Sequence, residues 1–309
     1  MPPPAVVAVV GPTATGKSDL AVALARELGG EVVNADSMQL YAGMDIGTAK
    51  LSQDERAGIP HPLLDLWPVT LTATAAAYQR LCRETLDGLL ARGVPAVVVG
   101  GSGLYLRAAL DRLDFPGTDA SLRASLEAEL AAHGPLPLHR RLAGLDAGAA
   151  ARMEPTNGRR VVRALEVVLL TGGMPGRLTS YEEHYRTCYL GLDRDDLAER
   201  IDARVARMFD LGLVAEVRGL VAAGLRDGVT ARQALGYAQV LAHLDGDGDE
   251  VQARERTAVA TRRFARRQRA WFRRDPRITW LVPGEDLLAR AVGAVASAGM
   301  VTVSHVNKG

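Results

Sequence analysis

Residues 11–18 carry the most specific chemical signal in the chain, reading Gly-Pro-Thr-Ala-Thr-Gly-Lys-Ser. An apolar run at 5–10 precedes them and a helical pattern at 19–28 follows. In this strand–turn–helix setting, successive backbone N–H groups and the helix dipole converge on an anion, and Lys17 adds a positive charge. The pattern predicts a phosphate cradle. Kinases, nucleotide hydrolases and some group transferases share it, so the cradle does not identify the phosphate compound.

Asp36 is the best candidate for a catalytic acid or base. It ends a predicted second strand at 31–37, and in open α/β sheets the ligand crevice lies beyond the carboxyl ends of the strands. Asp36 should therefore face the cradle, although a helix-cap or turn carboxylate is the structural alternative. The polar, glycine-punctuated stretch at 38–50 predicts a substrate-contacting loop.

The third predicted strand, 96–100, helps to separate the possible functions. It runs into Gly100-Gly101-Ser102, whereas many ATP-hydrolysing proteins with such a cradle hold magnesium with a carboxylate at this position. The difference counts against an ordinary ATPase. Glycines at the end of a strand allow close backbone approach to a ligand, and Ser102 offers a hydroxyl.

The elements that must position these groups alternate between strand and helix. Further strands are predicted at 187–192 and 278–282, strand character at 59–66, and helices at 74–91, from 195 to about 212, and at 285–298. This alternation predicts an α/β fold, a P-loop-type parallel sheet flanked by helices. An acidic stretch at 241–248 is expected to be an exposed loop.

A change of character at about residue 114 predicts a second domain. Helical patterns at 121–133, 137–143 and 159–170 follow, with no convincing strand. We therefore expect an inserted helical lobe at 114–185, a catalytic core made of 1–113 and 186–298, and a disordered tail at 299–309.

Arginines gather in two places. The lobe carries a loose basic set that could form a stripe for nucleic-acid phosphates or could be scattered solvated charge. These residues are Arg123, Arg140, Arg141, Arg152, Arg159, Arg160 and Arg163. The second group, at 262–274, is interleaved with Phe264, Trp271 and Phe272, which indicates contact with an anion or RNA. Helical spacing places four of its members on one face, namely Arg262, Arg266, Arg269 and Arg273.

Bulk properties exclude several classes of protein. The 309 residues carry a formal net charge of +1, so attraction to a polyanion must come from local clusters of arginine. Cys82 and Cys188 are far apart and His61 has no partner at metal-ligand spacing, so we expect no disulfide framework or zinc site. Without a signal-peptide pattern or an apolar stretch of about 20 residues, we expect a cytoplasmic protein.

Several motifs together resemble the bacterial tRNA dimethylallyltransferase (tRNA isopentenyltransferase) family, over about residues 6–280. Besides 11–18, they are Ala-Asp-Ser-Met-Gln-Leu-Tyr at 35–41, Met-Asp-Ile-Gly-Thr-Ala-Lys at 44–50, Gly-Gly-Ser-Gly-Leu-Tyr at 100–105, Arg-Ala-Leu-Glu-Val at 163–167, Leu-Gly-Tyr at 235–237 and Thr-Arg-Arg-Phe-Ala-Arg-Arg-Gln-Arg-Ala-Trp-Phe-Arg at 261–273. Their order and spacing make the resemblance specific.

The resemblance implies transfer of a dimethylallyl group from dimethylallyl diphosphate to N6 of adenosine 37 in tRNA, with Mg²⁺, by a monomeric enzyme. It implies that Asp36 is the general base, that Lys17 and Arg204 act on the diphosphate, and that Ser18 binds Mg²⁺. The implied diphosphate-binding residues are Gly11, Thr13, Ala14, Thr15, Gly16, Lys17 and Ser18. The implied tRNA-binding residues are Asp36, Ser37, Met38, Gln39, Ser102, Arg123, Arg159, Arg160, Arg163, Gly236, Tyr237, Arg262, Arg266 and Arg269.

The chain departs from the family pattern at a few positions. Ser102 stands where threonine is usual, Pro62 replaces the second histidine of a pair, and Arg266 and Ala270 replace lysine and threonine. The stretch at 157–160 is shorter than the usual pattern. Three alternatives stay open at this point: a small-molecule or nucleotide kinase, an enzyme that prenylates free adenine nucleotides, and an RNA-binding module with a vestigial cradle.

Overall fold

The computed structural model describes residues 6–174 and 180–300. The chain divides into two compact units. The core unit comprises Met1–Arg112 and Glu182–Gly309, and the helical unit comprises Leu113–Tyr181. None of the helices in the described part of the chain has the length and apolar character that a membrane span requires.

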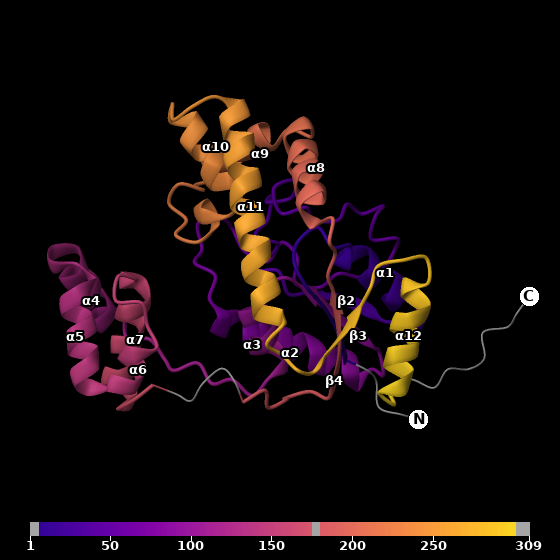
Figure 1. The fold of residues 1–309 in the computed structure, drawn as a ribbon, viewed down its shortest axis with the longest axis horizontal. Helices are drawn as coiled ribbons and strands as arrows, with labels where there is room; N and C mark the ends of the chain where they lie inside the picture. The colour runs from indigo at the N-terminus through magenta and orange to yellow at the C-terminus, as the bar shows by residue number, and fades with distance from the viewer. Residues whose placement is uncertain (1–5, 175–179, 301–309) are drawn as a thin grey trace, which may run out of the picture. The chain divides into compact units, whose positions relative to one another are not determined.

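A five-stranded parallel sheet forms the centre of the core unit, as predicted (Figure 1). Its order is β2-β3-β1-β4-β5. The strands are β1 Val6–Val10, β2 Glu31–Asn34, β3 Ala96–Gly100, β4 Thr187–Leu192 and β5 Ile278–Leu281. Val10 lies level with Gly100 on one side and Gly191 on the other. The carboxyl ends of three neighbouring strands therefore meet at one edge, where the cradle begins.

Every β1 side chain is buried because helices cover both faces of this sheet. Val7 and Val9 pack with α1 and α12 on one face, while Val6, Ala8 and Val10 pack with α2 and α3 on the other. Such burial on both faces is typical of parallel sheets and explains the continuous apolar run. The bounds are α1 Lys17–Leu28, α2 Ala75–Ala91, α3 Gly103–Leu110 and α12 Leu287–Ser297.

A second group of helices in the core unit packs around its own hydrophobic cluster. It consists of α8 Leu197–Asp210, α9 Leu213–Ala222, the 3₁₀ turn Ala231–Gln233, α10 Tyr237–Leu244 and α11 Glu250–Phe272. Tyr41 and Met44, from the loop after β2, are buried in the same cluster. The long helix α11 runs from this group to α3 (Figure 1). It thereby links the cluster to the carboxyl edge of the sheet.

The helical unit contains α4 Ala120–His133, α5 Pro135–Leu145, α6 Ala147–Ala151 and α7 Gly158–Thr171, and no strand among its described residues. Leu126, Leu138 and Leu165 are fully buried between these helices. Asp119 and Asn157 cap α4 and α7 by accepting backbone N–H groups at their first turns. Helix α6 was not anticipated, because five alanines and glycines carry no apolar period.

Three expectations about local structure were wrong. The second strand stops at Asn34, because the Asn34 side chain accepts the Asp36 N–H and turns the chain. Residues 59–66 form no strand; the Pro60 and Pro62 carbonyls accept N–H groups from β2, but proline has no N–H to return. Residues 241–244 belong to α10 instead of an exposed loop.

The predicted disordered tail lies outside the described residues from 301 onward. Met300, which we also placed in that tail, is buried against the α1 and α12 face of the sheet.

Candidate active site

The cradle is a turn whose geometry depends on two glycines. Gly11 has φ of +138°, and a Cβ atom there would lie 2.2 Å from the Leu192 carbonyl oxygen, so only glycine lets β1 end against β4. Gly16, with φ of +90°, is the N-cap of α1. The backbone N–H groups of the first helical turn therefore open onto the turn, as an anion site requires.

Three basic side chains hold the cradle. Lys17 Nζ donates to the Pro12 carbonyl at 2.5 Å. From α8, Arg204 Nη1 donates to Thr13 Oγ1 at 2.9 Å and Arg200 Nε donates to the Ala14 carbonyl at 2.8 Å. Burial and the nearby Arg204 charge lower the pKa of Lys17 to about 7, although the Asp36 carboxylate opposes the change. Burial also lowers the pKa of Arg204. The site thus concentrates positive charge that has little solvent around it.

Asp36 faces this charge, as the sequence predicted. Its Oδ1 accepts the Met38 N–H at 2.9 Å. Burial raises the pKa of Asp36, while the Met38 N–H and the Lys17 and Arg204 charges oppose the rise. A carboxylate whose charged form is costly, next to a cationic anion site, is a candidate proton acceptor. The structure therefore brings Lys17, Asp36 and Arg204 into one electrostatic cluster.

The turn after β3 forms the neighbouring wall. Ser102 Oγ accepts the Ser37 N–H at 3.4 Å, and the two hydroxyl oxygens lie 3.2 Å apart. A Cβ atom on Gly100 would lie 2.4 Å from the Ala35 carbonyl oxygen, so glycine permits the two turns to touch. This places Ser102 against Ser37, the residue that follows Asp36.

Gln268 of α11 is a site residue that our sequence reasoning missed. Its Oε1 accepts the Thr13 N–H and its Nε2 donates to the Gly101 carbonyl, both at 2.9 Å. The side chain is buried, in a stripe with Thr261, Ala265 and Phe272. That spacing of four, three and four residues was visible in the sequence and could have indicated that Gln268 faces inward.

Comparison with known proteins identifies the family of this chain. A family model described as IPP transferase matches residues 39–275, most of the chain. The chain belongs to the IPP transferase family. A tRNA dimethylallyltransferase of Thermobifida fusca is 59% identical over 299 residues, which cover 94% of each protein. The enzyme of the same name from Streptomyces coelicolor is 59% identical over 286 residues and 92% of each.

Solved structures of the family share the fold. The full-length tRNA isopentenylpyrophosphate transferase of Bacillus halodurans has a TM-score of 0.70 and 36% identity, covering 96% of this chain and 98% of its own. A eukaryotic dimethylallyltransferase, described as acting on tRNA, has a TM-score of 0.76 and 25% identity, covering 98% of this chain and 87% of its own.

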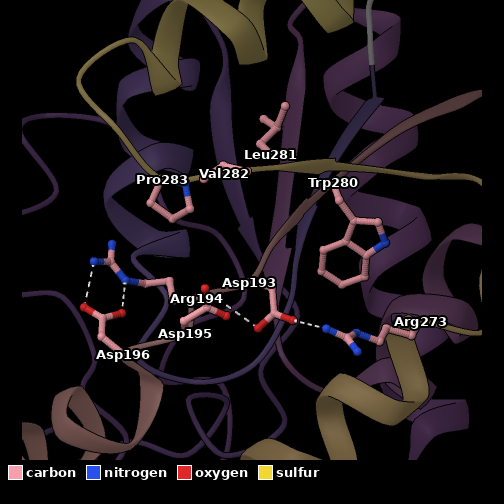
Figure 2. Close-up of a pocket in the computed structure, with 9 residues that line it drawn as sticks. All are labelled: Asp193, Arg194, Asp195, Asp196, Arg273, Trp280, Leu281, Val282 and Pro283. Atoms are coloured by element: carbon pink, nitrogen blue, oxygen red, sulfur yellow. Dashed lines mark hydrogen bonds and ion pairs between the residues drawn. The ribbon is translucent and has the colours of Figure 1, made fainter.

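Most of the predicted arginine face of this IPP transferase's α11 is paired within the chain. Arg269 donates to Asp193 at 2.6 Å and to the Arg194 carbonyl at 2.7 Å, and Arg273 lies 3.1 Å from Asp193 (Figure 2). Arg262 pairs with Asp202 of α8. Arg266 is exposed. These pairs anchor α11 to α8 and to the end of β4, a role that the sequence did not reveal.

A cavity of about 570 Å³ opens beside this anchor, at the carboxyl ends of β4 and β5 (Figure 2). Its lining includes Asp193, Arg194, Arg273 and Trp280, and none of the predicted diphosphate-binding residues. Arg194 pairs there with Asp196 at 2.7 Å. The cavity is therefore separate from the cradle.

In the helical unit, two predicted tRNA contacts share one buried carboxylate. Glu166 is fully buried and pairs with Arg123 and, at 2.7 Å, with Arg163. Although burial opposes it, the hydrogen bonds from Arg163 and Arg123 hold the pKa of Glu166 below its usual value. Both guanidinium groups remain about one-third exposed, and Arg159 and Arg160 are exposed. Arg123 and Arg163 thus pair with the buried Glu166 and are still partly accessible at the surface.

Tyr237 and Gly236 are the remaining predicted tRNA contacts, and His61 and the two cysteines are the residues for which no metal role was expected. Tyr237, expected on tRNA, is fully buried and its hydroxyl donates to Glu216 at 2.6 Å; Gly236, with φ of +86°, precedes it as the N-cap of α10. His61 Nδ1 bonds the Ile59 carbonyl, as expected of a structural histidine. In the described residues, Cys82 and Cys188 are buried and unbridged, and no group of three or more His, Cys, Asp or Glu residues could hold a metal ion.

Proposed function

We propose that this IPP transferase moves a dimethylallyl group from dimethylallyl diphosphate to N6 of adenosine 37 in tRNA and releases diphosphate. The observation that carries the proposal is the position of Asp36 beside the Lys17–Arg204 cradle. This arrangement supplies a proton acceptor next to a site for an anionic leaving group. The names of the relatives support the same reaction.

The proposed chemistry explains why these groups occur together. Adenine N6 is a weak nucleophile because its lone pair is delocalised into the ring, so it needs a positioned base. As the N6–carbon bond forms, the carbon–oxygen bond to diphosphate breaks and its electron pair stays on the oxygen. Asp36 takes the N6 proton, while Lys17 and Arg204 oppose the charge that develops on the diphosphate.

The cradle also fits a magnesium ion. Mg²⁺ in proteins commonly keeps only one or two protein ligands and takes the rest from phosphate oxygens and water. The Ser18 hydroxyl at the start of α1 suits that mode, which needs no cluster of protein carboxylates. A bound Mg²⁺ would neutralise part of the diphosphate charge.

The tRNA would meet Ser37, Met38, Gln39 and Ser102 next to Asp36. In the helical unit, Arg123, Arg159, Arg160 and Arg163 would contact phosphates without reading sequence. Adenine N6 is hidden in a stacked anticodon loop, so the nucleotide must leave the stack, at a cost of a few kcal/mol (about 2–4).

The reaction is tested by incubating the protein with labelled dimethylallyl diphosphate, Mg²⁺ and total tRNA, then digesting the RNA to nucleosides. We expect label in a prenylated adenosine, formed about 10²–10⁴ times more slowly by the Asp36→Asn variant. The competing kinase function predicts ATP turnover and a phosphorylated product. Such turnover without prenylated adenosine would overturn the proposal.

A further inference from the structure

Two motifs of the sequence, 44–50 and 235–237, have no part in the chemistry described so far, yet both meet one side chain. Glu216 of α9 accepts the Ile46 N–H at 2.7 Å and the Asp45 N–H at 3.2 Å through Oε2. Its Oε1 accepts the Gly47 N–H at 3.3 Å and the Tyr237 hydroxyl at 2.6 Å. A single carboxylate therefore joins the loop to α10.

The packing around Glu216 leaves the loop little room. A Cβ atom on Gly47 would lie 2.4 Å from the Tyr237 ring and 2.9 Å from Leu213. Glycine at 47 and tyrosine at 237 are therefore complementary: the bare backbone of one lies against the ring of the other. Three backbone N–H groups that converge on one carboxylate resemble an anion nest, and such charge-assisted bonds are stronger than neutral ones.

The same loop is tied back to the segment beside Asp36. Gln39 Nε2 donates to the Thr48 carbonyl at 3.0 Å. Lys50, whose side chain is almost fully buried, donates to the Tyr41 carbonyl at 3.1 Å and pairs with Asp45 at 2.5 Å. A displacement of residues 45–47 would therefore also move Gln39, through its hydrogen bond to the Thr48 carbonyl in the same loop.

Gln39 follows Met38, whose N–H bonds the Asp36 carboxylate. The cradle itself is held by other contacts, from Arg200, Arg204 and Gln268. The hydrogen bonds that hold the loop and those that hold the cradle thus come from different side chains.

We propose that Glu216 is a positioning residue for the acceptor tRNA: it fixes the 38–50 segment so that Met38 and Gln39 are already in place when the adenosine arrives. The inference rests on the proposed function, because it assigns the segment to the acceptor side of that reaction. Its loss acts on the tRNA step and leaves the diphosphate cradle intact.

Two variants test the inference from opposite sides of the contact. Glu216→Gln removes the charge and one acceptor from the carboxylate. Gly47→Ala keeps Glu216 but drives a methyl group into the Tyr237 ring, so the loop must move. Matched controls are Glu255→Gln, an exposed position on α11, and Gly88→Ala, where a Cβ atom on α2 meets nothing within 4 Å.

Each variant is measured for kcat and KM with tRNA and with dimethylallyl diphosphate, for affinity to inorganic pyrophosphate, and for Tm. We expect kcat/KM for tRNA to fall about 10- to 100-fold in both test variants, the range that misplacement by a fraction of an ångström to 1 Å can produce. KM for dimethylallyl diphosphate and affinity for pyrophosphate should change less than about twofold, and the controls should match the wild type.

The outcomes separate the inference from the proposed function. If the wild type makes no prenylated adenosine, the proposed function fails. If the wild type is active but both test variants match the controls, or if both lose tRNA and pyrophosphate parameters equally, the positioning role of Glu216 is overturned. Should Glu216→Gln fail to fold, Gly47→Ala alone decides between these outcomes.

Discussion

Two groups of buried or partly buried charges lie in the core unit, and they differ in how well they are paired. Around Asp111, which is fully buried, Arg107 donates at 2.5 Å, Arg277 at 2.7 Å and the Tyr189 hydroxyl at 3.3 Å. In the described part of the chain, Asp36 forms no salt bridge with Lys17 or with Arg204. The first group has oppositely charged partners in direct contact, whereas the second has hydrogen bonds to backbone groups and to the Thr13 hydroxyl but no direct ion pair between its members.

The difference appears in the pKa values. Although burial opposes it, hydrogen bonds to Asp275 and Asp111 raise the pKa of Arg277 and stabilise its charged form. At the cradle, burial lowers the pKa values of Lys17 and Arg204 and raises that of Asp36. Burial therefore favours the neutral form of each group. Charged groups that remain energetically unfavourable in the folded protein are typical of functional sites, because a bound ligand or a transferred proton can stabilise them.

The Asp111 group has a structural task that explains its full pairing. The backbones of Asp111 and Glu183 form an isolated antiparallel β-bridge, and the Arg112 N–H donates to the Glu182 carbonyl at 2.8 Å. These contacts join the chain segment that leaves the core unit to the segment that returns to it. We infer that one buried charge group holds the fold and the other performs chemistry, and this contrast yields the following predictions.

The largest effect on stability should come from Asp111→Ala. The variant leaves the buried Arg107 and the largely buried Arg277 without their shared partner, and removal of one partner of a buried pair costs about 3–5 kcal/mol. Denaturant unfolding measures this loss. Activity of the fraction that remains folded should be close to normal. Loss of activity at unchanged stability would contradict a purely structural role for the Asp111 group.

A smaller effect, on activity, is expected for Arg204→Leu. The variant removes the bond to Thr13 Oγ1 and a charge that faces the diphosphate, and hydrogen bonds to charged groups contribute about 1.5–3 kcal/mol. We expect kcat/KM for dimethylallyl diphosphate to fall about 10- to 100-fold, with unfolding free energy unchanged or raised because a buried charge is gone. Steady-state kinetics at saturating tRNA measure the change.

The pH dependence should show both shifted groups. Since the pKa of Asp36 is raised, its carboxylate is protonated, and the base lost, at pH values above those at which an ordinary aspartate protonates. The pKa of Lys17 is lowered to about 7, so its positive charge is lost as the pH rises through that value. Affinity for inorganic pyrophosphate should therefore fall by at most about tenfold per pH unit above 7. A flat profile in a Lys17→Met variant is the control.

The smallest effect should come from Arg262→Gln at the surface pair with Asp202. The Arg262 side chain is about one-third exposed and that of Asp202 about half exposed, and pairs so accessible to solvent contribute about 0–1 kcal/mol. We expect little change in Tm and a small loss of tRNA affinity that disappears at high salt, because one phosphate contact is screened. A loss that persists at high salt would contradict a purely electrostatic contribution of Arg262 to tRNA binding.

The part of this site that could be predicted from sequence is the part built from neighbours in the chain. The strand, turn and helix of the cradle follow one another, and Asp36 comes two residues after the end of the next strand, so local pattern was sufficient. Gln268 and Glu216 act across 255 and about 170 residues of sequence, and no local period shows which backbone N–H groups they will meet. Arg123 and Arg163 were expected either in a stripe for nucleic-acid phosphates or as solvated charge, and no local pattern showed that both pair with the buried Glu166.

The central claim is that Asp36 serves the reaction and not the fold. The most direct test is single-turnover transfer by the Asp36→Asn variant, at saturating tRNA and dimethylallyl diphosphate, together with its unfolding free energy. Loss of a general base should lower the rate by about 10²–10⁴, while tRNA affinity stays the same and stability is equal or higher because a buried charge has been removed. A near-normal rate, or a loss of stability like that of Asp111→Ala, would contradict the account.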